Sequence, residues 1–297
     1  METLFEQVRS NKLRSYLMFL FFIILLGILG AVLGLVWGDV NIGLFVAVFI
    51  SILYSFFAYY SGDQLILKMT GAREATKKEF PFLINTVEGL AIAAGLPAPK
   101  AYVIDDSAMN AFATGRDPQH ASITVTTGLL KVMKREELEG VIAHEMSHVQ
   151  NYDIRFMMLT AIMVGLTTLI SDFILRSIWY GGKRGSSRRG VHPAIILIGV
   201  FFAILTPLIG QLIQFAISRQ REYLADANAA VLTRYPPGLA SALEKIKKDP
   251  DPLVDNANKA TAHLFISTPF RDRTDFVTNL FSTHPPIDER IKRLKAM

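Results

Sequence analysis

Two histidines, four positions apart and with a glutamate between them, stand near the middle of the 297-residue chain in the stretch HEMSH, residues 144–148. On a helix, residues four apart share one face, so His144 and His148 can bind one metal ion. Zn²⁺ suits such ligands, needs a third protein ligand and keeps one position for water. Glu145 lies at the adjacent edge, where it can take a proton from a water whose pKa the metal lowers toward ~7. The pattern predicts one Zn²⁺ per chain and hydrolytic chemistry.

The residues around this stretch predict a helix independently of the metal. Leu138, Val141, Ile142 and Met146 have helical spacing, and acidic residues precede them. No proline follows Lys134 until position 193, so we expect the helix to continue into the next apolar segment. A chance match to the motif, which arises in roughly one protein in a hundred of this composition, is the competing interpretation.

The third ligand is expected from the stretch SRQREYLADANAA, residues 218–230. Glu222 and Asp226 lie on one helical face there. One carboxylate can bind the metal, and the second can accept a hydrogen bond from an imidazole N–H and so orient it. A solvated helix charge is the alternative for Glu222 taken alone. His192 lies at the far end of a membrane segment and cannot reach the site.

Long apolar segments predict a membrane protein. The chain is 51% hydrophobic and only 19% charged, and the uncharged runs 16–37 and 40–60 are long enough to cross a ~30 Å hydrocarbon core. The first run exceeds the ~7–15 residues of a signal-peptide core, so we expect it to be retained. Basic residues outside these two runs place the N-terminus on the cytoplasmic side. They also account for the net charge of +5, and since no basic stripe is interleaved with aromatics, we expect no nucleic-acid partner.

Four regions are expected along the chain: an N-terminal membrane hairpin (1–60), a cytoplasmic part with the HEMSH helix (61–155), a second membrane hairpin (156–217) and a cytoplasmic part with the third ligand (218–297). Within 61–155 we expect a helix over 77–94. Alternating β-branched residues and turn chemistry predict a small antiparallel sheet from AYVID, NAFATG and SITVTTG. Later helices are expected through the 220s, at 239–248 and at 287–295.

The second hairpin raises a conflict of topology. His148 and Glu222 must meet at one ion, so the segment between them has to return to the same side of the membrane. If it crosses fully, the basic loop GGKRGSSRRG lies outside, against the positive-inside tendency. Full crossing and a shallow, partly embedded hairpin both satisfy the metal geometry, and we favour crossing.

The order of these motifs resembles a known family. HEMSH, then a membrane hairpin, then EYLAD, with NAFATG upstream and STHPP near the end, is similar to the HtpX-type membrane zinc metalloproteases, relatives of the CAAX prenyl proteases. The resemblance covers nearly the whole chain. It implies His144, His148 and Glu222 as zinc ligands and Glu145 as the base.

The same resemblance implies a fold and a function. The fold would be a mainly α integral membrane protein with four apolar helical segments and a cytoplasmic zincin-like α+β metalloprotease domain. The activity would be an endopeptidase that removes misfolded or damaged membrane proteins, acting on polypeptides beside the lipid bilayer. We expect a multi-pass protein of the cell membrane, with both termini and the active site cytoplasmic.

Substrate contacts are predicted at two places. An edge strand at 110–115 can hold an extended peptide by main-chain hydrogen bonds, which makes Asn110, Ala111, Phe112 and Ala113 candidates; an ordinary hairpin strand is the alternative. His284, in the stretch STHPP, is a candidate donor to the developing oxyanion, or else a surface histidine before a turn. The rival functions are a prenyl-protein processing protease and a non-catalytic, zinc-stabilised membrane scaffold.

Overall fold

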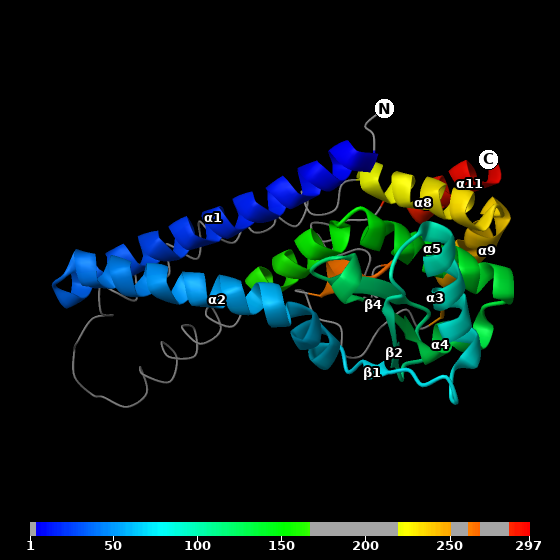
Figure 1. Ribbon diagram of the computed structural model, residues 1–297, viewed down its shortest axis with the longest axis horizontal. Coiled ribbons are helices and arrows are strands. Elements are labelled where there is room, and N and C mark those ends of the chain that lie inside the picture. The colour runs from blue at the N-terminus through cyan, green and yellow to red at the C-terminus, as the bar shows by residue number, and fades with distance from the viewer. Residues whose placement is uncertain (1–3, 167–218, 251–260, 268–284) are drawn as a thin grey trace.

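A hairpin of two long helices, α1 (Leu4–Trp37) and α2 (Val40–Met69), projects from the rest of the molecule (Figure 1). The computed structural model describes residues 4–166, 219–250, 261–267 and 285–297. The two helices are joined at Gly38, which adopts a left-handed φ of 99°, and Asp39. The Asp39 carboxylate caps α2 by accepting hydrogen bonds from the N–H groups of Asn41 and Ile42. These are the two residues that separate the uncharged runs 16–37 and 40–60, so the predicted N-terminal hairpin is confirmed.

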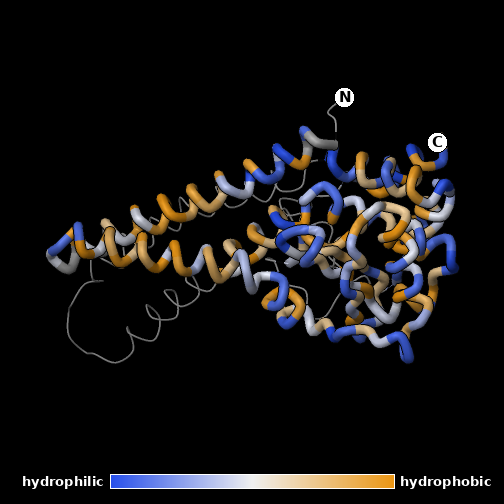
Figure 2. The backbone as a smooth tube through the Cα atoms, in the orientation of Figure 1, coloured by the Kyte–Doolittle hydropathy of each residue, from blue (hydrophilic) through white to orange (hydrophobic). Residues whose placement is uncertain are grey.

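Most residues along this hairpin are hydrophobic, apart from those at the start of α1 and at the tip (Figure 2). Within the described ranges, two helices are long and apolar enough to cross a membrane, at Val8–Ala31 and Val40–Met69. Only 28% and 11% of an 18-residue window within each of these stretches are buried by protein, whereas the core helix of a soluble protein would be mostly covered. Large apolar side chains on both helices, among them Phe45, Phe49 and Phe56, are exposed. Contact with lipid hydrocarbon is the environment that suits this surface.

Small residues let the two helices of the hairpin approach closely near its tip. A Cβ added to Gly30 would lie 2.4 Å from the carbonyl oxygen of Gly43, and one added to Gly43 would lie 2.7 Å from the Cα of Gly34. Membrane helices commonly use small residues in this way, since packing rather than exclusion of water brings them together.

One small sheet lies at the base of the hairpin. Its strands are β1 (Arg73–Glu74), β2 (Lys100–Ile104), β3 (Ala111–Gly115) and β4 (Ala121–Thr126), in the order β1-β2-β4-β3. Strands β3 and β4 form the predicted hairpin, but β4 inserts between β3 and β2 and pairs with β2 in parallel. The sheet is therefore mixed, and the expectation of a purely antiparallel sheet was wrong. Alternation along each strand does not specify the spatial order of strands, which packing decides.

Helices surround this sheet and build the main core with it. They are α3 (Pro81–Ala94), α4 (Thr127–Val132), α5 (Arg135–Gln150), α8 (Arg219–Thr233), α9 (Pro236–Lys247) and α11 (Ile287–Lys295), with short 3₁₀ turns η1 (Pro118–His120) and η2 (Ala262–Leu264). Helix α3 starts later than the predicted 77, because Pro81 occupies its first turn and disfavours helix before it. Helix α5 packs against α3, α8, α9 and β3, which puts the HEMSH stretch in the core.

A break follows α5, contrary to the expected continuous helix. Residues 151–152 form a turn, in which Tyr152 has a left-handed φ of 61°, and a new helix begins at 153. Its described part, up to 166, is buried against the hairpin, where the Tyr54 hydroxyl donates to the carbonyl of Ile162. Residues 167–217, the rest of the predicted second membrane hairpin, lie outside the described residues.

Candidate metal centre

A side chain of helix α5 stabilises the first turn of the helix, and the helix places the two histidines in the protein interior. The Glu137 carboxylate accepts a hydrogen bond from the main-chain N–H of Lys134, at 2.6 Å. This contact satisfies a donor that the helix leaves unpaired at its beginning. One turn apart near the other end, His144 and His148 are only 1% and 5% exposed.

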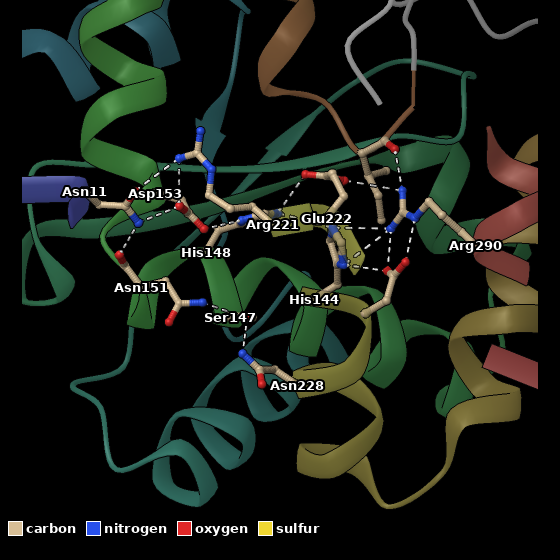
Figure 3. A network of polar contacts seen from close by, with 12 residues as sticks. Asn11, His144, Ser147, His148, Asn151, Asp153, Arg221, Glu222, Asn228 and Arg290 are labelled. Carbon is tan, nitrogen blue, oxygen red and sulfur yellow. Dashed lines mark hydrogen bonds and ion pairs between the residues drawn. The ribbon is translucent and has the colours of Figure 1, made fainter. Parts of the chain in front are cut away.

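Helix α8 brings Glu222 to the two imidazoles (Figure 3). Its two carboxylate oxygens lie 3.7 Å from Nε2 of His144 and 3.4 Å from Nε2 of His148. The two Nε2 atoms are 3.3 Å apart. One ligand atom from each of the three residues therefore lies within 4.8 Å of the others, so the structure brings together the three predicted ligands.

A carboxylate contacts the Nδ1 atom of each imidazole, so that Nε2 is the atom left to face the other ligands. Nδ1 of His144 is 3.0 Å from Asp226, as predicted for one of the two acids of α8, and Nδ1 of His148 is 3.0 Å from Asp153. An ionised carboxylate only accepts, so both Nδ1 atoms carry hydrogen, and in the neutral imidazoles both Nε2 atoms keep a lone pair for a metal ion. Two nitrogens and a carboxylate, convergent and buried, match the donor set of a zinc site with three protein ligands. The residues present fit Zn²⁺.

The surroundings of the two histidines shift their pKa values in opposite directions, and at His148 a metal cation has to compete with a proton. Burial lowers the pKa of His144, and the charge of Arg290 lowers it further. Burial also acts to lower the pKa of His148, but its hydrogen bonds to Asp153 and Glu222 outweigh burial and raise that pKa well above 6.5. Because a metal ligand must be deprotonated, a cation has to displace the proton of His148.

Glu145 lies buried beside the ligands, with 2% of its surface exposed. Burial raises the pKa of its carboxyl group from 4.5 to about 7, although nearby positive charge and a hydrogen bond from the main chain of Ala113 act in the opposite direction. A carboxylate with a pKa near the working pH is suited to accept and return a proton. The contact with Ala113 also sets Glu145 directly against strand β3.

Sequence reasoning missed Arg290, which reaches the site from α11. Its Nε and Nη2 donate to the two oxygens of Asp226 at 2.9 and 2.7 Å, and its Nη1 lies 3.6 Å from Glu222. Burial acts to raise the pKa of Asp226, but Arg290 outweighs it and holds that pKa at about 2. Helical spacing places Arg290 on the apolar face of α11 with Ile287, Ile291 and Leu294, a signal that predicts its burial. The spacing does not reveal Asp226 as its partner, because that contact depends on how α11 docks.

The predicted substrate residues are placed in part. Within the described part of the chain, Ala111–Gly115 forms β3 at one edge of the sheet, paired with β4 alone among the strands. Phe112 packs toward the hairpin side, whereas Ala111 and Ala113 belong to the main core. The side chain of Asn110 contacts Ser267 rather than the metal ligands. His284 lies outside the described residues.

Comparison with known proteins identifies the family. The model described as "Peptidase family M48" matches residues 77–297. A "Protease HtpX homolog" from Dictyoglomus thermophilum is 47% identical over 295 residues, covering 99% of this chain and 95% of that protein. One of the same description from Thermoanaerobacter pseudethanolicus is 49% identical over 303 residues, covering 100% and 98%.

A solved structure shares the fold. The crystal structure of S. mikatae Ste24p aligns with a TM-score of 0.52 and 22% identity, over 97% of this chain and 66% of that one. The family model and the full-length relatives agree with the resemblance found in the sequence. Together with the exposed apolar hairpin, they show that this chain is a membrane metalloprotease belonging to peptidase family M48.

Proposed function

We propose that the protein is a zinc-dependent endopeptidase that cleaves misfolded or damaged membrane proteins at the cytoplasmic face of the membrane. The observation that carries this proposal is the convergence of His144, His148 and Glu222 beside Glu145, a buried carboxyl group with a pKa of about 7. Three metal ligands with a proton acceptor next to them are typical of a hydrolytic zinc site, whereas a purely structural zinc site fills all four coordination positions with protein ligands.

The chain's own residues supply the proton transfers. Zn²⁺, when bound, supplies a Lewis acid that acidifies water and polarises a carbonyl. Glu145 accepts a proton from the attacking water, whose oxygen bonds to the scissile carbonyl carbon, and returns the proton to the leaving nitrogen as the C–N bond breaks. Asp226 and Asp153 keep the imidazoles oriented throughout. The products are two peptides, and no bond to the protein forms.

Strand β3 is suited to hold an extended substrate. Its main chain contacts Glu145 at Ala113, and two positions earlier the carbonyl of Ala111 accepts a hydrogen bond from the N–H of Ile266 at 2.9 Å. Asn110 adds a donated hydrogen bond to the carbonyl of Ser267 at 3.0 Å. The segment 261–267 thus pairs with this edge much as a substrate strand would. We propose that the substrate takes its place, bound by Asn110 and by the main chain of Ala111 and Ala113. The main chain of Phe112, between them, faces Thr124 of β4.

The position of the site suits substrates that are themselves in the membrane. Asp153, which contacts the ligand His148, accepts a hydrogen bond from Asn11 near the start of α1, so the metal centre lies beside this end of the hairpin. Basic residues lie at that end of both helices, at Arg9, Lys12 and Lys68, while Asp39 lies at the tip. This charge distribution supports a cytoplasmic active site.

Substitution of Glu145 by glutamine tests the function. The purified full chain, loaded with Zn²⁺, would be assayed for cleavage of an unfolded membrane protein and of the same protein when folded. We expect Glu145→Gln to lower the rate by about 10²–10⁴-fold, because the proton acceptor is lost. Glu136→Gln, an exposed change on the same helix, should have no effect. Cleavage by Glu145→Gln at the parent rate would refute the mechanism, whereas a zinc-loaded parent protein that cleaves neither substrate would favour a zinc-stabilised scaffold.

A further inference from the structure

The metal centre is connected to the membrane hairpin through one buried side chain (Figure 3). Asn11, on α1, is only 3% exposed. Its Nδ2 donates hydrogen bonds of 2.8 Å to Oδ1 of Asp153 and of 2.8 Å to the carbonyl of Asn151. Asp153 uses its other oxygen, Oδ2, for the 3.0 Å contact with His148. A membrane helix therefore lies two contacts away from a metal ligand.

The contacts around Asn11 require an amide. Its Oδ1 accepts a hydrogen bond from Nη1 of Arg221 at 3.3 Å, while its Nδ2 faces the two acceptors. The same Arg221 nitrogen donates to Oδ1 of Asp153 at 3.1 Å. A carboxylate in place of the amide would keep the contact with Arg221, but it would lose both donated hydrogen bonds and would face the charge of Asp153. Asparagine offers a donor and an acceptor on the sides where each is needed.

The local backbone also depends on α1. Successive helix residues are rotated by about 100°, so a position five residues after His148 would point about 140° away from it on an unbroken helix. The left-handed conformation of Tyr152 turns the chain and brings Asp153 back to His148. Such a conformation is costly for a non-glycine residue and persists where its surroundings hold it. The ammonium group of Lys12, the neighbour of Asn11, lies 4.3 Å from the centre of the Tyr152 ring.

We propose that Asn11 is a positioning residue of the metal centre, through which the first membrane helix sets the metal affinity. By fixing the Asp153 carboxylate, Asn11 keeps the His148 ring turned so that its Nε2 faces Glu222. Hydrogen-bond partners behind a metal ligand typically change metal affinity by about 10–100-fold when removed. The zinc affinity then depends on how α1 packs against the protease domain. The inference rests on the proposed zinc site.

Zinc affinity of the full chain in detergent micelles, measured by competition with a chromophoric chelator, tests the proposal. We expect Asn11→Ala and Asn11→Asp to weaken binding by about tenfold. Asn11→Asp nearly preserves size, so its loss of affinity reports the missing donor and the added charge rather than a packing defect. Leu13→Ala, at a 57% exposed position on the same turn, should bind as the parent does. The visible spectrum of Co²⁺-loaded protein should change for the Asn11 variants alone, because ligand orientation changes.

A double-mutant cycle separates the route through Asp153 from a general effect. In an Asp153→Ala background, Asn11→Ala should weaken zinc binding no further, because the group through which it acts is gone. Parent-like affinity of both Asn11 variants, additive losses in the cycle, or an equal loss in Leu13→Ala would each overturn the inference while leaving the zinc site in place. A parent protein that binds no stoichiometric zinc would overturn the proposed function and the inference with it.

Discussion

Replacement of Glu145 by glutamine should stabilise the metal-free protein, and the gain should grow as the pH rises. Burial raises the pKa of this carboxyl group from 4.5 to about 7. Between these values the folded state keeps a proton that the unfolded state releases, so folding stability falls as the pH rises through this window. Glutamine has no proton to lose, and its carbonyl oxygen can still accept the hydrogen bond from Ala113.

The magnitude follows from the difference of 7 − 4.5 = 2.5 pKa units. At 1.36 kcal/mol per unit, Glu145 destabilises the metal-free protein by about 3 kcal/mol above pH 7 and by less than about 1 kcal/mol at pH 5. A change of 1 kcal/mol shifts the melting temperature of a domain of this size by about 2–4 °C. We therefore expect Glu145→Gln to raise it by about 6–12 °C at pH 8 and by less than about 4 °C at pH 5.

The assay is thermal unfolding of the full chain in detergent with a chelator present, followed by circular dichroism at pH 5 and pH 8. Glu136→Gln, exposed on the same helix, is the matched control and should leave the melting temperature unchanged at both pH values. Added Zn²⁺ should reduce the advantage of Glu145→Gln, because a nearby cation favours the ionised carboxylate. A gain that does not depend on pH, or one that the control shares, would show that the pKa of Glu145 is not raised.

Three further outcomes are expected. Zinc affinity should rise by up to about tenfold per pH unit between pH 6 and 8, because the raised pKa of His148 makes a proton compete with the metal; a flat profile in chelator competition would contradict this. Arg290→Leu should destabilise the protein by about 3–5 kcal/mol, since it leaves Asp226 charged, buried and without this partner, and an unchanged melting temperature would refute that reasoning. Gly140→Ala should lower the melting temperature, because the new Cβ would lie 2.7 Å from a main-chain nitrogen of α9. Gly89→Ala, with open space around it on α3, should instead raise the folding stability by about 0.5–1 kcal/mol. The opposite order of the two melting temperatures would argue against this packing.

Sequence reasoning succeeded where the signal is local or strongly periodic. A spacing of four residues places His144 and His148 on one face of any helix, and the same rule pairs Glu222 with Asp226. Hydrophobic length alone predicted the hairpin of α1 and α2, because an apolar run of that length has few alternatives to a membrane span. The β3–β4 hairpin followed from its turn residues, and α11 begins and ends where it was predicted.

The rest was decided by tertiary structure. Asp153 stands five residues after His148, a spacing that points away on a continuous helix, and only the left-handed turn at Tyr152 brings the two together. Asn11 and Arg290 come from opposite ends of the chain, and both are functional candidates only because α1 and α11 dock against the same centre. The pKa of Glu145 depends on burial, which is a property of the packed core. The sequence by itself determined which ligands could share a helix face. The fold decided which side chains contact and orient those ligands, because contacts between distant segments have no spacing from which they can be predicted.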